Sequence, residues 1–263
     1  MLRRRREAQA LGPLGHGRII DRLGVVAETA QQAVADRLAN GSGGYVCFTN
    51  VHAVVTGRRD ARFRDVTNES FLSLADGKAV FWAGRARGAR DLGHVPGPDF
   101  MLAALRRFAT HRHYFYGGAP ATLDALVARL RETIPGLNVC GAYSPPFRPQ
   151  TEAERREDCA RIRDAGAEFV WMGLGAPKQE LWMAASAEEL RPAILFGVGA
   201  AFDFHAGTVR RAPAWMRTLG LEWLYRLCQE PRRLWRRYLV TNSLFVTYLI
   251  RDLWPAQRER ADG

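Results

Sequence analysis

The chain has 263 residues, 47% of them hydrophobic, which suits one domain with a full core and a small extension. Its formal net charge is +11, from 38 basic and 27 acidic residues, so partners that carry phosphate groups are favoured. Four scattered cysteines without a C-x-x-C pair, and no run of 18 apolar residues, argue against a disulfide framework, a cysteine metal site and a membrane span.

The first predicted elements are a basic arm and a helix. Residues 1–18 contain four consecutive arginines, Arg3–Arg6, and we expect this arm to be disordered or loosely docked. No apolar segment follows these arginines, so we expect no signal peptide. Apolar residues at helical spacing predict a helix over Asp21–Ala39, which Gly41–Gly44 ends.

Six short apolar runs follow, and each alternates with a helical segment. This pattern predicts a Rossmann-like α/β fold, with a mostly parallel sheet that helices cover on both faces. The runs are Tyr45–Phe48, Phe71–Ala75, Tyr114–Tyr116, Asn138–Gly141, Glu168–Met172 and Ala193–Val198. His111 and His113, before the third run, are expected in a solvated turn.

Polar residues and glycines follow each predicted strand. Because the carboxyl ends of parallel strands share one edge of a sheet, a ligand is expected there. This argument nominates Asn50, Asp76, Gln179 and Asp203. The segments are Thr49-Asn50, Asp76-Gly77, Gly117-Gly118, Tyr143–Pro146, Gly175–Glu180 and Gly199–Asp203.

The amino-acid composition changes after residue 204. Residues 205–263 hold eleven arginines against five acidic residues, a net charge of +6. Helices are predicted over Leu221–Gln229 and Pro231–Val240; if they were collinear, Arg226, Arg233 and Arg237 would share one face. Tryptophan, leucine and arginine together suit a membrane interface. We therefore divide the chain into the arm (1–18), a catalytic α/β domain (19–204) and a helical appendage (205–263).

Several of these features also have ordinary interpretations. Asp76 could be a general base in a cleft, or it could only fix a turn or cap a helix. Gly117-Gly118 could approach a nucleotide or form a plain tight turn. Gly197-Val198-Gly199 resembles a dinucleotide turn, but the third glycine is replaced by Phe202, so a nicotinamide-dependent oxidoreductase is the weaker alternative. A nucleic-acid-binding module is a further alternative, from the arginines. His52, His94 and His205 lack metal-ligand spacing.

Taken together, these motifs resemble the WecG/TagA/CpsF glycosyltransferases, glycosyltransferase family 26, from about Ile20 to Leu253. The sequence looks closer to the capsule and exopolysaccharide branch. The motifs that carry the resemblance are ADG (Ala75–Gly77), VPGPDF (Val95–Phe100), YGG (Tyr116–Gly118), GAYSPPF (Gly141–Phe147), GLGAPKQE (Gly173–Glu180), GVGAAFDFHAGTVRRAP (Gly197–Pro213) and GLEWLYRLCQEPRRLWRRYL (Gly220–Leu239).

The resemblance implies an inverting hexosyltransferase of cell-surface polysaccharide synthesis that needs no cofactor or metal. Its donor would be a UDP- or GDP-linked sugar, and its acceptor a polyprenyl-pyrophosphate-linked saccharide. Such an enzyme would be cytoplasmic and peripheral on the inner face of the plasma membrane, where it would meet an anionic lipid surface. We expect no nucleic-acid partner, and a homo-oligomer is left open.

The resemblance also assigns expected roles to residues. Asp76 would be the general base, and Asn50, Thr49 and Gln179 would complete the catalytic group. Residues expected to bind substrate are His94, Gly117, Gly118, Tyr143, Gly175, Lys178, Gly199, Asp203, Arg211, Arg226, Arg233, Arg236 and Arg237. The appendage arginines would offset diphosphate charge in place of a metal.

Two positions depart from the teichoic-acid members of the family. Phe48 stands where they tend to have threonine, and Thr49 is adjacent instead. His94 stands where they have arginine, so we expect the donor diphosphate to be held differently here. For this reason the N-acetylmannosamine donor is not transferred to this chain.

Overall fold

The computed structural model describes residues 27–261 apart from residue 91; of these, the side chains of residues 233 and 253–261 are not described. The predicted N-terminal arm and the first turns of the predicted helix at 21–39 therefore lie outside the described residues. Among the described residues, no helix combines the length and apolar character that crossing a bilayer requires.

Six parallel strands form one sheet in the order β2-β1-β6-β5-β3-β4. All six predicted strands are confirmed to within two residues at each end. The strands are β1 (Gly44–Thr49), β2 (Leu72–Ala75), β3 (His113–Gly117), β4 (Val139–Tyr143), β5 (Phe169–Gly173) and β6 (Ile194–Gly197). The predicted α/β class is thus confirmed, and every strand is parallel to its neighbours.

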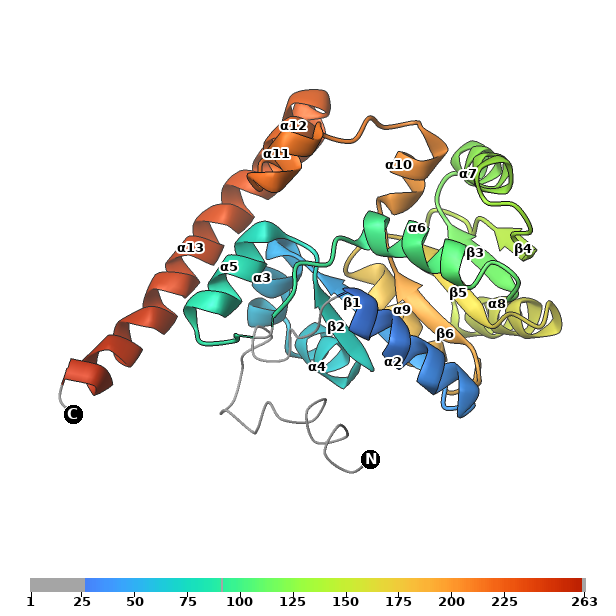
Figure 1. The fold of residues 1–263 in the computed structure, drawn as a ribbon, viewed down its shortest axis with the longest axis horizontal. Helices are drawn as coiled ribbons and strands as arrows, with labels where there is room; N and C mark the ends of the chain where they lie inside the picture. Colours follow the sequence, from blue (N-terminus) through green and yellow to red (C-terminus); the bar gives the residue numbers. More distant parts are fainter. Residues whose placement is uncertain (1–26, 91, 262–263) are drawn as a thin grey trace.

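Helices connect the strands and cover both faces of the sheet (Figure 1). They are α2 (Ala27–Ala39), α3 (Val51–Arg59), α4 (Ala61–Glu69), α5 (Lys78–Ala86), α6 (Gly97–Arg107), α7 (Pro120–Thr133), α8 (Glu152–Asp164), α9 (Lys178–Ser186), α10 (Ala201–Ala206), α11 (Ala214–Thr218), α12 (Glu222–Gln229) and α13 (Pro231–Ala261). The predicted boundary between residues 204 and 205 falls within α10.

The strands read as continuous apolar runs because both of their faces are buried. In β5, Phe169 and Trp171 pack into a cluster with α2, α6, α7 and α10. The alternate residues Val170 and Met172 pack on the other side with α8 and α9. Side chains alternate along a strand, so a strand covered by helices needs apolar residues at every position.

His113 lies in this buried sheet, so its prediction as part of a solvated turn is wrong. Its side chain is fully buried on β3, and its Nε2 lies 2.9 Å from the carbonyl oxygen of Phe108. The indole of Trp171 donates to Nδ1 at 3.2 Å. Burial lowers the pKa of His113 to about 4, because the charged imidazolium would lose its hydration.

The last helix is longer than predicted and packs on the core. α13 continues past Val240 to Ala261, because Phe245 is buried against Val54 and Val55 of α3 and Val80 of α5. An ion pair of 2.6 Å between Arg87 and Asp252 lies further along this contact. The appendage therefore shares a hydrophobic cluster with the α/β domain.

α12 and α13 are not collinear. Glu230 between them has the non-helical angles φ −128° and ψ 56°. Trp223 of α12 lies against Tyr238 of α13, with ring centroids 5.9 Å apart. Collinear helices would hold these residues about 22 Å apart, since a helix rises about 1.5 Å per residue. The chain therefore turns back after α12.

Candidate functional site

Asp76 directly follows β2 at the carboxyl edge of the sheet. Its Oδ1 accepts a hydrogen bond of 2.7 Å from the backbone N–H of Gly97, and its carbonyl oxygen accepts one of 3.1 Å from His94 Nε2. Burial raises the pKa of Asp76 and the Gly97 N–H lowers it, with a net rise. A carboxylate with a raised pKa is the better proton acceptor.

Asn50 and Thr49 lie on the neighbouring strand β1 and have structural partners. Asn50 caps α3, because its Oδ1 accepts from the N–H of Ala53 at 3.2 Å. A hydrogen bond from Asn50 also lowers the pKa of Asp76. Thr49 is buried, and its hydroxyl lies 2.8 Å from that of Ser73 on β2. The structure thus brings Asn50 to Asp76 but directs Thr49 into the sheet.

Gln179 joins the loops after β5 and β6. Its Oε1 accepts from the N–H of Gly175 at 3.0 Å, and its Nε2 donates to the carbonyl of Gly197 at 2.7 Å. A Cβ on Gly199 would lie 3.4 Å from Gln179 Oε1. Gln179, Gly175 and Gly199 are therefore together, as predicted. Gln179 is 4% exposed, so its side-chain amide is buried together with these partners.

Glu180 belongs to the same hydrogen-bond network, although its sequence position alone predicted no role for it. It is 2% exposed, and its Oε1 accepts from Gln179 Nε2 at 3.0 Å, while Oε2 is buried without a partner. Burial raises the pKa of Glu180 to about 7. The sequence signal was its place in GAPKQE, but only the fold shows that its side chain is buried.

The glycines after β3 allow close packing of backbone and rings. Gly117 has φ +105°, and a Cβ there would lie 2.9 Å from the backbone of Gly173. The ring of Phe202 occupies the space next to Gly173, where a Cβ would lie 2.4 Å from it. A dinucleotide-binding turn has its third glycine at the position that Phe202 occupies here, and this glycine allows close packing of helix and strand. Phe202 instead fills the space, which disfavours a dinucleotide at this turn.

The other predicted pocket residues lie after β3, β4, β5 and β6. The Tyr143 ring packs near Tyr116 and lies under the guanidinium of Arg161, 4.0 Å from its centre. Lys178 begins α9, with its ammonium 4.9 Å from the Phe147 ring centre. Asp203 lies in α10, beside Phe204. Gly118 follows Gly117, and its carbonyl accepts from Ser144 at 2.6 Å.

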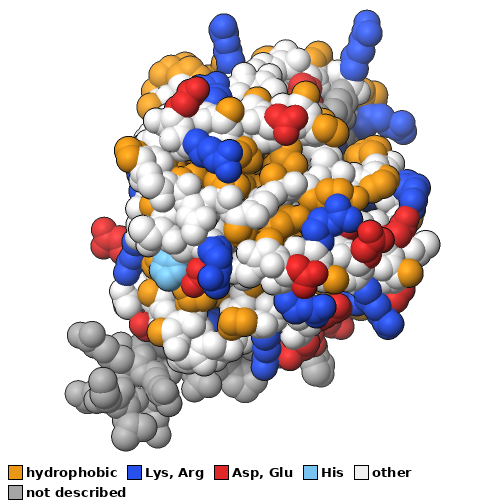
Figure 2. Space-filling view, turned by 90° about the vertical axis from the view of Figure 1, so that its right-hand side faces the viewer, with side chains coloured by type: hydrophobic (Ala, Val, Ile, Leu, Met, Phe, Trp, Pro, Cys, Tyr) orange, Lys and Arg blue, Asp and Glu red, His pale blue; other side chains and the backbone are white. Residues whose placement is uncertain are grey.

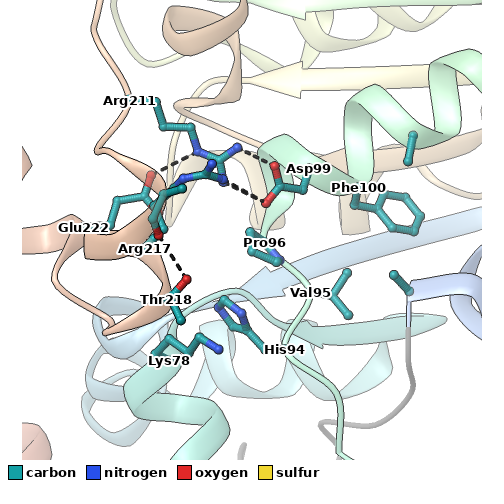
Figure 3. A pocket seen from close by; sticks show the side chains of 13 residues that line it. Lys78, His94, Val95, Pro96, Asp99, Phe100, Arg211, Arg217, Thr218 and Glu222 are labelled. Carbon is teal, nitrogen blue, oxygen red and sulfur yellow. Dashed lines mark hydrogen bonds and ion pairs between the residues drawn. The ribbon is translucent and has the colours of Figure 1, made fainter.

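A cavity of about 480 Å³ lies between residues 94–99 and the appendage (Figure 3). Asp76 does not line it, but His94 of the lining contacts the carbonyl oxygen of Asp76. Arg211 crosses it and pairs with Asp99 at 2.9 Å and Glu222 at 3.2 Å. Of the predicted substrate-binding residues, His94 and Arg211 line this cavity. The full lining is Ala27, Lys78, His94, Val95, Pro96, Asp99, Phe100, Ala103, Arg211, Ala214, Arg217, Thr218 and Glu222.

The cavity contains residues that the sequence analysis did not select. Lys78 is the first residue of α5, and Arg217 lies on α11 at 3.8 Å from Asp99. Asp99 and Glu222 lie in the sequence motifs GPDF and GLEW, but nothing in the sequence indicates that these two segments contact each other. Burial lowers the pKa of His94, and the neighbouring Lys78 lowers it further, so His94 is a neutral donor at pH 7.

Two appendage arginines lie near α10 and α3, the helices that follow β6 and β1. The guanidinium of Arg226 lies over the ring of Phe204, 5.4 Å from its centre, and its buried Nε has no partner. Burial lowers the pKa of His52 to about 4, and the charge of the nearby Arg237 contributes to this decrease. Arg236 lies beside the Trp235 ring, and the side chain of Arg233 is outside the described residues.

The face of the molecule over α7 and α8 carries both basic and acidic side chains, which are interspersed there (Figure 2). On α8, Arg161 pairs with Glu157 at 3.2 Å. In the part of the chain that the structure describes, no group of three His, Cys, Asp or Glu side chains is placed to hold a metal ion. Independence of metal stays a prediction.

The parallel α/β sheet, the carboxylate after β2 and the cation-lined cavity fit an enzyme that binds anionic substrates. A comparison with protein families identifies this enzyme class more closely. The model of the Glycosyl transferase WecG/TagA/CpsF family matches residues 18–259. The chain therefore belongs to this family, and it is a glycosyltransferase of cell-surface polysaccharide synthesis. This membership leaves the oxidoreductase and nucleic-acid alternatives without support.

Proposed function

We propose that this chain transfers a hexosyl residue, with inversion, from a UDP- or GDP-linked sugar to a polyprenyl-pyrophosphate-linked saccharide. The observation that carries the proposal is the carboxylate of Asp76, which the Gly97 N–H holds at the carboxyl edge of the sheet, next to His94 of the cavity lining. A base is what the attack of an acceptor hydroxyl on a diphosphate-activated sugar requires, and the appendage arginines would supply positive charge for the leaving diphosphate.

In the proposed reaction, the acceptor hydroxyl oxygen forms a bond to the anomeric carbon while Asp76 takes its proton. The bond from the anomeric carbon to the diphosphate oxygen breaks, and the nucleoside diphosphate leaves with that electron pair. Attack opposite the leaving group inverts the anomeric centre. Arg226 and Arg237, which lie near Phe204 of α10 and His52 of α3, would offset the charge that develops on the leaving group.

We further propose that the enzyme is peripheral on the inner face of the plasma membrane. α13 buries one side, which includes Leu234 and Phe245, and exposes apolar side chains on the other. The exposed set, which we call the α13 stripe, is Trp235, Leu239, Val246 and Ile250, each 51% exposed or more. The exposed Arg232 and Arg236 belong to the same helix. An apolar face with arginines beside it suits an anionic membrane interface.

The test of the catalytic proposal is Asp76→Asn. We expect transfer to fall by about 10²–10⁴-fold, the usual contribution of a general base, while nucleotide affinity stays within about twofold. The measurement pairs release of nucleoside diphosphate with a binding titration. Asp65→Asn is the matched control, since Asp65 is 61% exposed and lies away from the cavity. Loss of nucleotide binding in step with loss of transfer would show that Asp76 is structural instead.

A further inference from the structure

α11 has an unusual distribution of side chains for a helix of a water-soluble surface. Ala214, Arg217 and Thr218 line the cavity. Two large apolar side chains, Trp215 of the helix and Leu219 directly after it, are 61% and 57% exposed. The N–H of Leu219 donates to the carbonyl of Trp215, so the two side chains lie one turn apart on the same side. The helix therefore separates a polar cavity from an exposed apolar surface.

This apolar surface continues onto α5. Gly220 follows α11 with φ +73°, and a Cβ there would lie 2.9 Å from Lys78 Cβ and 3.1 Å from the Trp82 ring. Trp82 is itself 52% exposed. Trp82, Trp215 and Leu219 therefore form one exposed patch, which we call the aromatic rim. Lys78, one turn before Trp82 on α5, connects the rim to the cavity.

The charges of the cavity are not balanced. Its lining holds the cations Lys78, Arg211 and Arg217 against the carboxylates Asp99 and Glu222. Both carboxylates pair with Arg211, whereas Arg217 reaches Asp99 only at 3.8 Å and has a buried Nε without a partner. The Lys78 ammonium lies over the Phe81 ring, 5.6 Å from its centre. Lys78 and Arg217 are therefore available to an anion.

A diphosphate that carries an apolar chain matches both features. We propose that the cavity binds the diphosphate of the lipid-linked acceptor through Lys78 and Arg217, and that the aromatic rim binds its first isoprenoid units. This inference rests on the proposed function for the identity of the acceptor. The diphosphate of a nucleotide fits less well, because the glycines expected at the nucleotide, Gly117, Gly175 and Gly199, lie at the ends of β3, β5 and β6 and do not line the cavity.

The saccharide of the acceptor would then extend toward Asp76. His94 lines the cavity and donates to the Asp76 carbonyl, and Pro96 of the lining precedes Gly97, whose N–H holds the Asp76 carboxylate. The aromatic rim would bind the lipid, Lys78 and Arg217 would bind the diphosphate, and the sugar would then lie toward Asp76. Asp99 and Glu222 would keep Arg211 fixed while the anion binds beside it.

The experiment measures calorimetric binding of two soluble probes, geranyl diphosphate and inorganic pyrophosphate, to the full chain without membranes. We expect geranyl diphosphate to bind at least about tenfold more tightly, because its ten carbons can cover the rim. The Lys78→Gln/Arg217→Gln variant should weaken both probes about tenfold or more. The Trp215→Ser/Leu219→Ser variant should remove the difference between them and leave pyrophosphate binding unchanged.

Matched controls are Arg232→Gln, an exposed arginine on α13, and Phe147→Ser, a fully exposed ring in the loop after β4. Both should bind the probes like the wild type. Equal affinity of the wild type for both probes, or an unchanged difference in the rim variant, would overturn the inference, as would competition of UDP or GDP with geranyl diphosphate. Sugar transfer is measured separately, so a protein that binds geranyl diphosphate but transfers no sugar would refute the proposed function alone.

Discussion

Single buried side chains hold the loops at the carboxyl edge of the sheet in place. Gln179 accepts from Gly175 and donates to Gly197, and Glu180 accepts the second amide proton of Gln179. The orientation of the Gln179 amide is thereby fixed, so two loops of the site move as one. The structure shows no cation pairing with Glu180 among the described residues, and its carboxylate is therefore poorly stabilised when ionised.

Glu180→Gln should change stability in a pH-dependent way. The pKa of Glu180 in the folded protein is about 7, above its ordinary value of 4.5, so the fold favours the protonated form. The wild type loses stability as pH rises from about 4.5 to about 7, and it does not regain it above that range. Glutamine stays neutral and avoids this loss, which is about 3 kcal/mol for such a shift.

Urea unfolding between pH 4.5 and pH 8 measures this effect. The two proteins should have similar unfolding free energies at pH 4.5, and the variant should be the more stable one at pH 8. Glu188→Gln is the control for the substitution itself, since Glu188 is 78% exposed and its replacement should change the unfolding free energy little. A variant that is less stable than the wild type at pH 8 would contradict the argument.

Sequence reasoning at the residue scale could locate side chains that directly follow strands; their roles in the site stay predictions. Asp76, Asn50 and Gln179 could be nominated because parallel strands end at one edge. Lys78 and Arg217 could not, because they belong to helices that are far apart in the chain and meet only when α11 packs beside α5. His113 was misplaced because its polar neighbours suggested a turn, whereas its two hydrogen bonds allow it to be buried.

Among the elements, the turn between α11 and α12 determines the position of the cavity wall. Gly220 has φ +73° and lies in contact with Lys78 and Trp82 of α5. Gly220→Ala should destabilise the protein by about 1–2 kcal/mol, from the left-handed backbone and the close approach. It should also lower acceptor affinity, because α11 would move away from α5.

Thermal unfolding and acceptor-dependent kinetics test this prediction. Gly136→Ala is a matched control for strain alone, since Gly136 has φ +76° but nothing within 4 Å of a Cβ. Both variants should lose stability, and only Gly220→Ala should raise the KM for the acceptor. An equal effect of the two variants on the KM would argue against the role of the α11–α12 turn.

The α13 stripe makes a prediction of its own. Its residues are spaced by four, seven and four positions, which places them on one side of the helix. Leu239→Ser/Ile250→Ser should reduce cosedimentation with anionic vesicles at least about tenfold, because two large apolar side chains no longer enter the interface. Phe147→Ser, which removes an exposed ring elsewhere, should sediment as the wild type does. Equal sedimentation of all three proteins would exclude the stripe as the membrane-binding surface.

More of the overall fold than of the candidate site could be predicted from the sequence. Near-continuous apolar runs define buried parallel strands, so the six strands and the class of fold could be predicted. The direction of the chain after Glu230 could not, because a helix break specifies no angle. The predicted common face of Arg226, Arg233 and Arg237 depended on that angle. The structure brings Arg226 to Phe204 and Arg237 to His52 instead.

In the function that we propose, the carboxyl edge of this sheet binds a nucleotide-sugar for transfer. A thermal-shift series with UDP-sugars, GDP-mannose, UDP, GDP and NADH tests this binding, with the wild type and Asp76→Asn compared side by side. We predict that the ligands of one nucleotide base raise Tm equally in both proteins and that NADH does not. Stabilisation by NADH alone would contradict the account, because the glycine turns would then hold a dinucleotide despite Phe202.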